Sequence, residues 1–74
     1  MTLKEIQPGE RAKVTRLCGE GAVKRRIMDM GLTRGTEVTV VKVAPIGDPI
    51  ELDARGYSLS IRKDEAATIE VERL

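Results

Sequence analysis

Residues 50–61 constrain the fold more than any other stretch, because their pattern is that of a β-hairpin. Apolar and polar residues alternate through residues 50–54 and again through residues 57–61, with Arg55 and Gly56 between the two runs. Alternation with a period of two is typical of strands that bury one face. A two-residue turn at Arg55-Gly56 places the apolar residues of both runs on the same face. The predicted pairs are Ala54 with Tyr57, Leu52 with Leu59 and Ile50 with Ile61.

Similar alternation predicts three further strands, at residues 10–17, 36–44 and 69–72. Short helical turns are expected at residues 2–5, which have the spacing of a capping box, and at residues 63–67. The residues expected to face inward are Leu3, Ile6, Ala12, Val14, Val38, Val40, Val41, Val43, Ile69 and Val71. Within the valine-rich strand the inward positions change from even to odd numbers, which predicts a bulge or a sharp bend.

Between the first two strands, residues 22–30 change to the spacing of a helix. Val23, Ile27 and Met30 fall at positions i, i+4 and i+7 and form one apolar stripe. The sequence therefore predicts a short helix that packs this stripe against the sheet.

The helix is predicted to end at Gly31, where a residue in the left-handed conformation commonly follows the last turn. Leu32 then contacts Ile27, as in a Schellman motif. Gly31 and Leu32 thus have a structural task before any functional one. The residues assigned to caps and turns are Gly31, Leu32, Gly35 and Gly56.

About five short strands and one inserted helix predict a mainly β fold in a single domain, residues 1–74. A strongly bent, partly closed barrel covers the apolar face of so small a sheet best. The expected architecture is a small SH3-like β-barrel with a short α-helix inserted after the first strand. The chain has one cysteine and no histidine, so an internal disulfide and a Cys/His zinc site are both excluded.

The charges argue against a nucleic-acid-binding protein. Lysine and arginine number 13 against 12 acidic residues, a net charge of +1, whereas nucleic-acid-binding domains usually carry a strong basic excess. One tyrosine and no phenylalanine or tryptophan leave no platform for stacking bases. No apolar run reaches membrane-spanning length, and no signal peptide is expected. These features predict a cytoplasmic protein, stabilised by an aliphatic core and open to weak self-association or to a partner.

No catalytic or metal-binding residue is predicted. Cys18 lies beside a glycine without a histidine to activate it, so the expected reading is a spare thiol. Met28 and Met30 point about 200° apart on a helix and cannot chelate one ion together. Glu51 and Asp53 share a strand face but occupy ordinary outward positions. No cofactor is expected either.

The basic triplet at residues 24–26 is first read as a solvated helix face, in which Arg25 and Arg26 can both pair with Asp29. Met28 does not fit this simple picture, because it lies off the buried stripe and near Lys24. Two readings remain open. Either Met28 and the basic residues form an adaptable contact surface, or another loop of the barrel covers Met28.

Several segments together closely resemble the ferrous iron transport protein A family. The segments are Gly19-Glu20-Gly21-Ala22, Arg26-Ile27-Met28-Asp29-Met30-Gly31-Leu32, Ala44-Pro45-Ile46-Gly47-Asp48-Pro49-Ile50-Glu51 and Arg55-Gly56-Tyr57. The match spans nearly the whole chain. Two turn residues depart from the family pattern, since Glu20 replaces a common glycine and Arg34 a common proline.

The resemblance implies an SH3-like barrel and a part in bacterial ferrous iron uptake. The implied partner is ferrous iron transport protein B, an inner-membrane protein with a cytoplasmic GTP-binding domain. The favoured function is a non-enzymatic interaction module, with contact expected through Lys24, Arg25 and Met28 or, failing those, through the loop at residues 45–49. One alternative is a GTPase activator that supplies Arg25 or Arg26. Another is a metal-sensing domain like the C-terminal domain of iron-dependent repressors, which this family also resembles.

Overall fold

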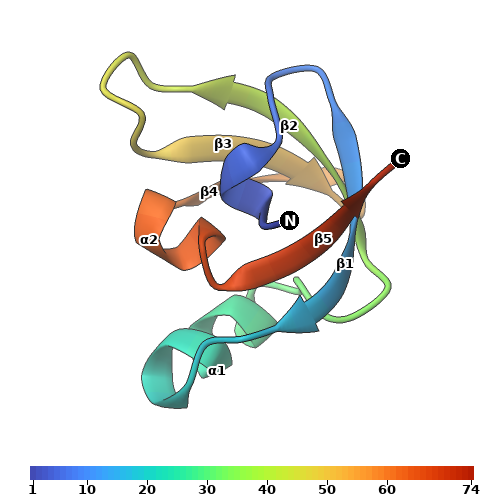
Figure 1. Ribbon diagram of the computed structural model, residues 1–74, viewed down its shortest axis with the longest axis vertical. Coiled ribbons are helices and arrows are strands. Elements are labelled where there is room, and N and C mark those ends of the chain that lie inside the picture. The colour runs from blue at the N-terminus through green and yellow to red at the C-terminus, as the bar shows by residue number, and fades with distance from the viewer.

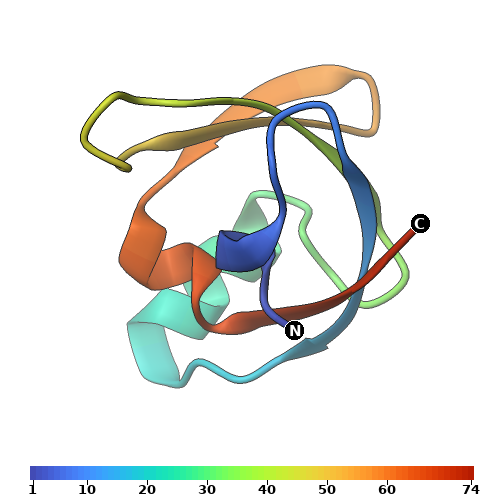
Figure 2. The same ribbon diagram turned by 45° about the horizontal axis from the view of Figure 1, so that its top comes forward.

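The chain folds around one antiparallel sheet of five strands. The computed structural model describes all 74 residues. Its elements in chain order are the 3-10 helix η1 (Leu3–Glu5), β1 (Arg11–Leu17), α1 (Gly21–Asp29), β2 (Glu37–Val43), β3 (Ile50–Ala54), β4 (Tyr57–Ile61), α2 (Lys63–Ala66) and β5 (Ile69–Arg73). The strand order is β4-β3-β2-β1-β5, and the sheet curls strongly so that β1 and β5 face the β3–β4 hairpin (Figures 1 and 2). The predicted mainly β fold, with one helix inserted after the first strand, is confirmed.

The hairpin forms as the alternation predicts. Ile50 pairs with Ile61, Leu52 with Leu59 and Ala54 with Tyr57. Arg55 and Gly56 have φ angles of 52° and 84°, so both turn residues are left-handed. Two left-handed residues in a two-residue loop match the natural twist of the flanking strands.

A bulge in β2 confirms the predicted change of parity. Val40 pairs with Leu52, but Lys42 pairs with Glu51, which leaves Val41 as the extra residue. Val41 was expected to face inward, and this is wrong, because its side chain is 51% exposed. The residue inserted at a bulge has no partner across the ladder and turns outward here.

A second bulge, in β1, was not predicted. Val14 pairs with Val71 and Arg16 with Glu70, so Thr15 is the extra residue. Strict alternation after Val14 would turn Arg16 toward the core. The bulge instead leaves Arg16 exposed and sets half-buried Leu17 opposite buried Ile69.

The core consists of 15 buried aliphatic residues. The edge strands β4 and β5 do not pair with each other, and α2 joins them directly. Across this opening lies η1, which packs against α2 and β5 and buries Leu3, while Ile6 is buried just after it (Figure 2). The capping box expected at residues 2–5 does not form, because the Thr2 side chain caps nothing. Residues 1 and 2 instead extend the sheet along β5.

None of the helices has the length and apolar character needed to cross a membrane.

The two adjacent valines of β2 provide a direct test of the bulge. Val40 is fully buried and Val41 half-exposed. We expect Val40→Ala to lower the free energy of unfolding by about 2 kcal/mol, because it removes buried apolar volume. Val41→Ala should change it by less than about 0.5 kcal/mol, as an exposed substitution does. Urea unfolding followed by circular dichroism measures both values, and equal losses would contradict the assigned register.

Candidate partner-binding surface

Helix α1 contacts the core mainly through its last turn. Ile27 is its one fully buried residue, and Met30, just past its end, is half-buried. Val23 was expected on the buried stripe, and this is wrong, because its side chain is 42% exposed. Residues 21–26 of α1 are all exposed, so this part of the helix lies outside the core. Most of the helix surface is therefore free for other contacts.

The end of α1 has the geometry of a Schellman motif. Gly31 has a φ of +88°, and its N–H donates to the carbonyl of Met28 at 2.9 Å. The N–H of Leu32 donates to the carbonyl of Ile27 at 3.2 Å. Ile27 and Leu32 are both fully buried, as the hydrophobic contact of this motif requires. Ile27, in the last turn of α1, and Leu32, just after the helix, thus both anchor the helix end in the core.

Two further carbonyls at this end accept hydrogen bonds from side chains outside the helix. The Tyr57 hydroxyl donates to the carbonyl of Met30 at 2.9 Å, and the Thr36 hydroxyl to that of Gly31 at 3.2 Å. Arg55 donates to the same Thr36 hydroxyl oxygen. The hairpin turn is thereby fastened to the helix end. Sequence reasoning assigned Tyr57 and Arg55 only to the hairpin and missed this contact.

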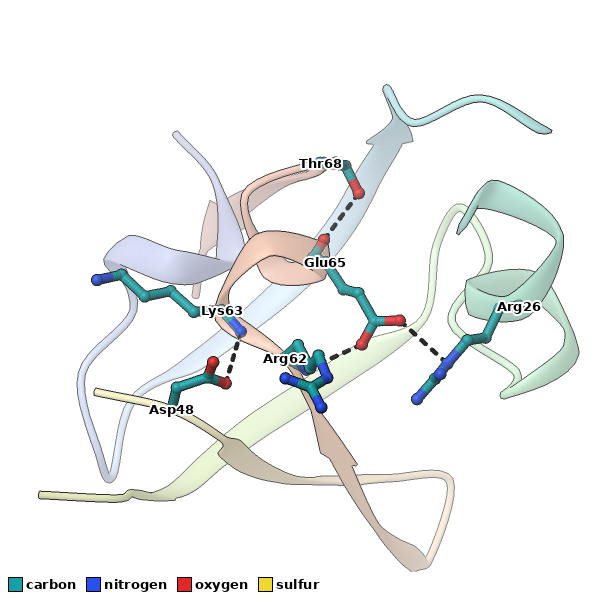
Figure 3. A network of polar contacts seen from close by, with 6 residues as sticks. All are labelled: Arg26, Asp48, Arg62, Lys63, Glu65 and Thr68. Carbon is teal, nitrogen blue, oxygen red and sulfur yellow. Dashed lines mark hydrogen bonds and ion pairs between the residues drawn. The ribbon is translucent and has the colours of Figure 1, made fainter. Parts of the chain in front are cut away.

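A buried carboxylate ties α1 to α2. Glu65 is 8% exposed, and its Oε2 lies 3.0 Å from Nε of Arg26, while its Oε1 accepts the N–H of Arg62 at 2.9 Å (Figure 3). A buried charge is costly unless it is paired and hydrogen-bonded, as this one is. The expected pairing of Arg25 and Arg26 with Asp29 is wrong, because Arg26 turns to Glu65 and Arg25 forms no ion pair.

The three residues predicted to contact a partner lie together on the outer face of α1. Lys24, Arg25 and Met28 line one shallow depression, along with Gly21 and Asp29. Met28 is 47% exposed, so no loop of the barrel covers it fully. Neither of the two cations is in an ion pair. The arrangement offers an adaptable apolar side chain flanked by two flexible positive charges.

Cys18 and Asp53, which lie outside this face, are each hydrogen-bonded to a neighbouring side chain. The exposed thiol of Cys18 donates a hydrogen bond to the carboxylate of Glu70, and this bond raises the pKa of Cys18. A raised pKa leaves less thiolate at neutral pH, the opposite of an activated nucleophile. Asp53 accepts a hydrogen bond from Ser58. No three His, Cys, Asp or Glu side chains lie close enough together to hold a metal ion.

One family model matches nearly the whole chain. The model of the FeoA domain matches residues 1–73. A relative from Porphyromonas gingivalis, an Fe(2+) transport protein A/Fe(2+) transporter FeoB fusion protein, is 40% identical over 72 residues, which are 97% of this chain and 8% of that protein. This chain therefore spans only a small part of that relative.

Two solved structures show the same fold. An NMR structure of a FeoA-like protein from Clostridium acetobutylicum is 50% identical, with a TM-score of 0.94 over 100% of this chain and 86% of that one. The crystal structure of Stenotrophomonas maltophilia FeoA complexed with zinc, called a prokaryotic SH3 domain protein, is 28% identical, with a TM-score of 0.84 over 97% and 89% of the two chains. These likenesses confirm the predicted SH3-like fold.

Both the positive φ of Gly31 and the nearby Tyr57 hydroxyl oppose a side chain at this position. Replacing Gly31 should therefore reduce the free energy of unfolding more than replacing another left-handed glycine. A Cβ at Gly31 would lie 2.5 Å from Oη of Tyr57, whereas one at Gly9, with a similar φ, meets nothing. We expect Gly9→Ala to lose about 1 kcal/mol of stability from backbone strain, and Gly31→Ala roughly 1 kcal/mol more from the displaced Tyr57 hydrogen bond. Chemical denaturation measures the difference. In a Tyr57→Phe background the extra loss should shrink, and two equal glycine losses would contradict the steric argument.

Removing the Arg26 side chain, and with it the ion pair to Glu65, should lower the stability of the protein. Removing the side chain of the neighbouring Arg25 should have little effect. Removing the Arg26 side chain leaves the Glu65 carboxylate buried without its cation. Because Arg26 is itself half-exposed and screened, we expect Arg26→Ala to cost about 1–2 kcal/mol rather than the full penalty of a buried pair. Arg25→Ala, on the same helix, should cost less than about 0.5 kcal/mol. Thermal and urea unfolding measure the stability of the two variants. Equal losses of stability in Arg26→Ala and Arg25→Ala would contradict this assignment.

Proposed function

The chain belongs to the FeoA domain family, and on that premise we propose that it is an interaction module of bacterial ferrous iron uptake that binds the transporter FeoB. The observation that carries this proposal is the Porphyromonas gingivalis relative, in which the two proteins are fused in one chain. Fusion raises the effective concentration of one part for the other, which favours parts that bind each other. The proposal places the chain on the cytoplasmic side, in contact with the GTP-binding domain of FeoB.

The outer face of α1 is the proposed contact surface. Lys24, Arg25 and Met28 take part in no ion pair and in little of the core, so they are available to a partner without loss to the fold. Methionine adapts its shape to the surface it meets, and long basic side chains contribute both apolar stems and charge. This combination suits a protein partner rather than a small substrate.

A second candidate function, activation of GTP hydrolysis, depends on one arginine. An arginine that stabilises the charge of phosphoryl transfer must be able to leave its own protein surface. Arg26 is held by buried Glu65, which makes it a poor choice. Arg25 is exposed and in no ion pair, and it is therefore the candidate for this role.

The metal-sensing alternative has less support. It needs several ligands around one ion, and no three suitable side chains lie together. Nothing in the structure favours this function over partner binding.

Removing the contact surface should weaken binding without unfolding the protein. We expect Arg25→Ala combined with Met28→Ser to keep the circular dichroism spectrum of the parent, because both side chains are exposed. Binding to full-length FeoB in nanodiscs should fall at least about tenfold if the pair lies near the centre of the contact. Binding by the parent should also weaken as salt is raised, because part of the attraction is between charges.

The matched control carries Lys4→Ala with Val41→Ser, which removes one exposed cation and one exposed apolar side chain elsewhere. Equal binding by both double variants would show that FeoB contacts another surface. The loop at residues 45–49 would be the first to test. GTP turnover by FeoB in the same samples separates the two functions. A rise that the parent causes and Arg25→Lys abolishes, at unchanged binding, would favour the activator.

A further inference from the structure

A shallow hollow adjoins the outer face of α1 and shares Lys24 and Met28 with it, and the charge of this hollow is strongly one-sided. Arg16, Lys24 and Arg34 line a hollow of about 730 Å³, which is completed by Leu17, Met28 and two threonines. We refer to this hollow as the basic cup. None of its lining residues is acidic, although the whole chain carries a net charge of only +1.

The three cations of the basic cup come from three separate segments. Arg16 is at the end of β1, Lys24 on α1 and Arg34 in the turn before β2. The bulge at Thr15 turns Arg16 outward and thereby brings it into the cup. A charge cluster assembled from distant segments is not the solvated face of a single helix.

No cation of the basic cup takes part in an ion pair. The three ion pairs of the chain involve Arg11, Arg26 and Arg73. The nearest acidic neighbour on the sheet is Glu70, opposite Arg16, and its carboxylate accepts the hydrogen bond of Cys18. Arg16 and Lys24 both act to lower the pKa of the Cys18 thiol, although the larger effect of Glu70 raises it overall. At this edge of the cup the carboxylate of Glu70 therefore partly offsets the charges of Arg16 and Lys24.

We infer that the basic cup binds a short acidic segment of the protein partner, with one apolar side chain of that segment packed against Met28 and Leu17. The inference rests on the proposed function and names the chemistry of the partner. Three positive groups around a hollow attract a chain of carboxylates and fix its position, because charges at the edge of an interface chiefly steer and orient a partner. The apolar surface within the hollow favours a segment that also carries an aliphatic side chain.

Two other anionic ligands fit the basic cup less well. A phosphate or nucleotide site usually adds several converging backbone N–H groups or a helix N-terminus to the side-chain charges. The chain has no glycine-rich phosphate loop, and its one tyrosine lies outside the cup. Recognition of an anionic lipid surface usually uses a cluster of about four to eight lysines and arginines, whereas the cup has three cations.

The test compares two pairs of charge removals. Arg16→Ala with Arg34→Ala removes two charges from the cup, and Lys4→Ala with Arg62→Ala removes two exposed charges elsewhere. All four residues are exposed, and circular dichroism checks that both variants fold. Binding to full-length FeoB in nanodiscs of neutral lipid should weaken roughly five- to tenfold in the cup variant, and its salt dependence should become shallower. The control should bind as the parent does.

Equal binding by the cup variant and its control would overturn the inference. The proposed function would still stand if the parent bound FeoB and Arg25→Ala alone weakened that binding, because Arg25, unlike Met28, lies outside the cup. If the parent itself did not bind FeoB, the proposed function would fall. The cup is then tested alone by NMR titration with an acetylated Glu-Leu-Asp-Glu peptide and its Gln-Leu-Asn-Gln counterpart. Shifts at Arg16, Thr33 and Arg34 with the acidic peptide alone would support the inference, and no shift would overturn it.

Three further measurements identify a different occupant. Binding to phosphatidylserine vesicles that the cup variant loses would assign the hollow to a lipid surface. Shifts at the cup with inorganic phosphate as large as with the acidic peptide would assign it to a free anion. Self-association in sedimentation equilibrium that the cup variant loses would assign it to a second copy of the chain. Each of these results would replace the acidic peptide segment and overturn the inference.

Discussion

Fifteen aliphatic side chains must be covered by a sheet whose two edge strands do not pair with each other, and the other elements serve this requirement. With no disulfide and no cluster of metal ligands, apolar burial is the main source of stability, at roughly 25 cal/mol for each Å² removed from water. The opening between the edges is covered by α2 and η1, and the end of α1 closes the barrel at one side. Each covering element buries only a few residues, so each must be held in place by specific contacts such as those at Gly31 and Glu65.

Helix α1 is divided between the fold and the solvent. Ile27 enters the core, and Arg26 neutralises the buried carboxylate of Glu65, so this side of the helix is committed to stability. Lys24, Arg25 and Met28 on the other side contribute almost nothing to the barrel. Two adjacent arginines on one helix thus have different tasks, because only one lies within reach of a buried charge. Folding and binding can therefore be altered separately.

The bulge in β1 connects the architecture to the surface chemistry. Without the extra residue at Thr15, the alternation would turn Arg16 into the core, where an unpaired charge is costly. With it, Leu17 packs against the core instead, and Arg16 joins Lys24 beside α1. A local change in strand register, required by burial, thus also creates the one-sided charge of the basic cup.

The sequence by itself determined the features that depend on near neighbours. Alternation predicted each pair of the hairpin and a bulge or bend in the valine-rich strand, but not that Val41 turns outward there. The apolar residues around Gly31 predicted how α1 ends. It also predicted an exposed position for Met28, as one of two readings. The tertiary structure alone decided that Val23 lies outside the core, that Arg26 turns to Glu65 rather than to Asp29, and that Tyr57 fastens the helix end. These outcomes depend on where the barrel ends and on which residues, distant in the sequence, meet there. A periodic pattern indicates only the face of a helix or strand on which a residue lies.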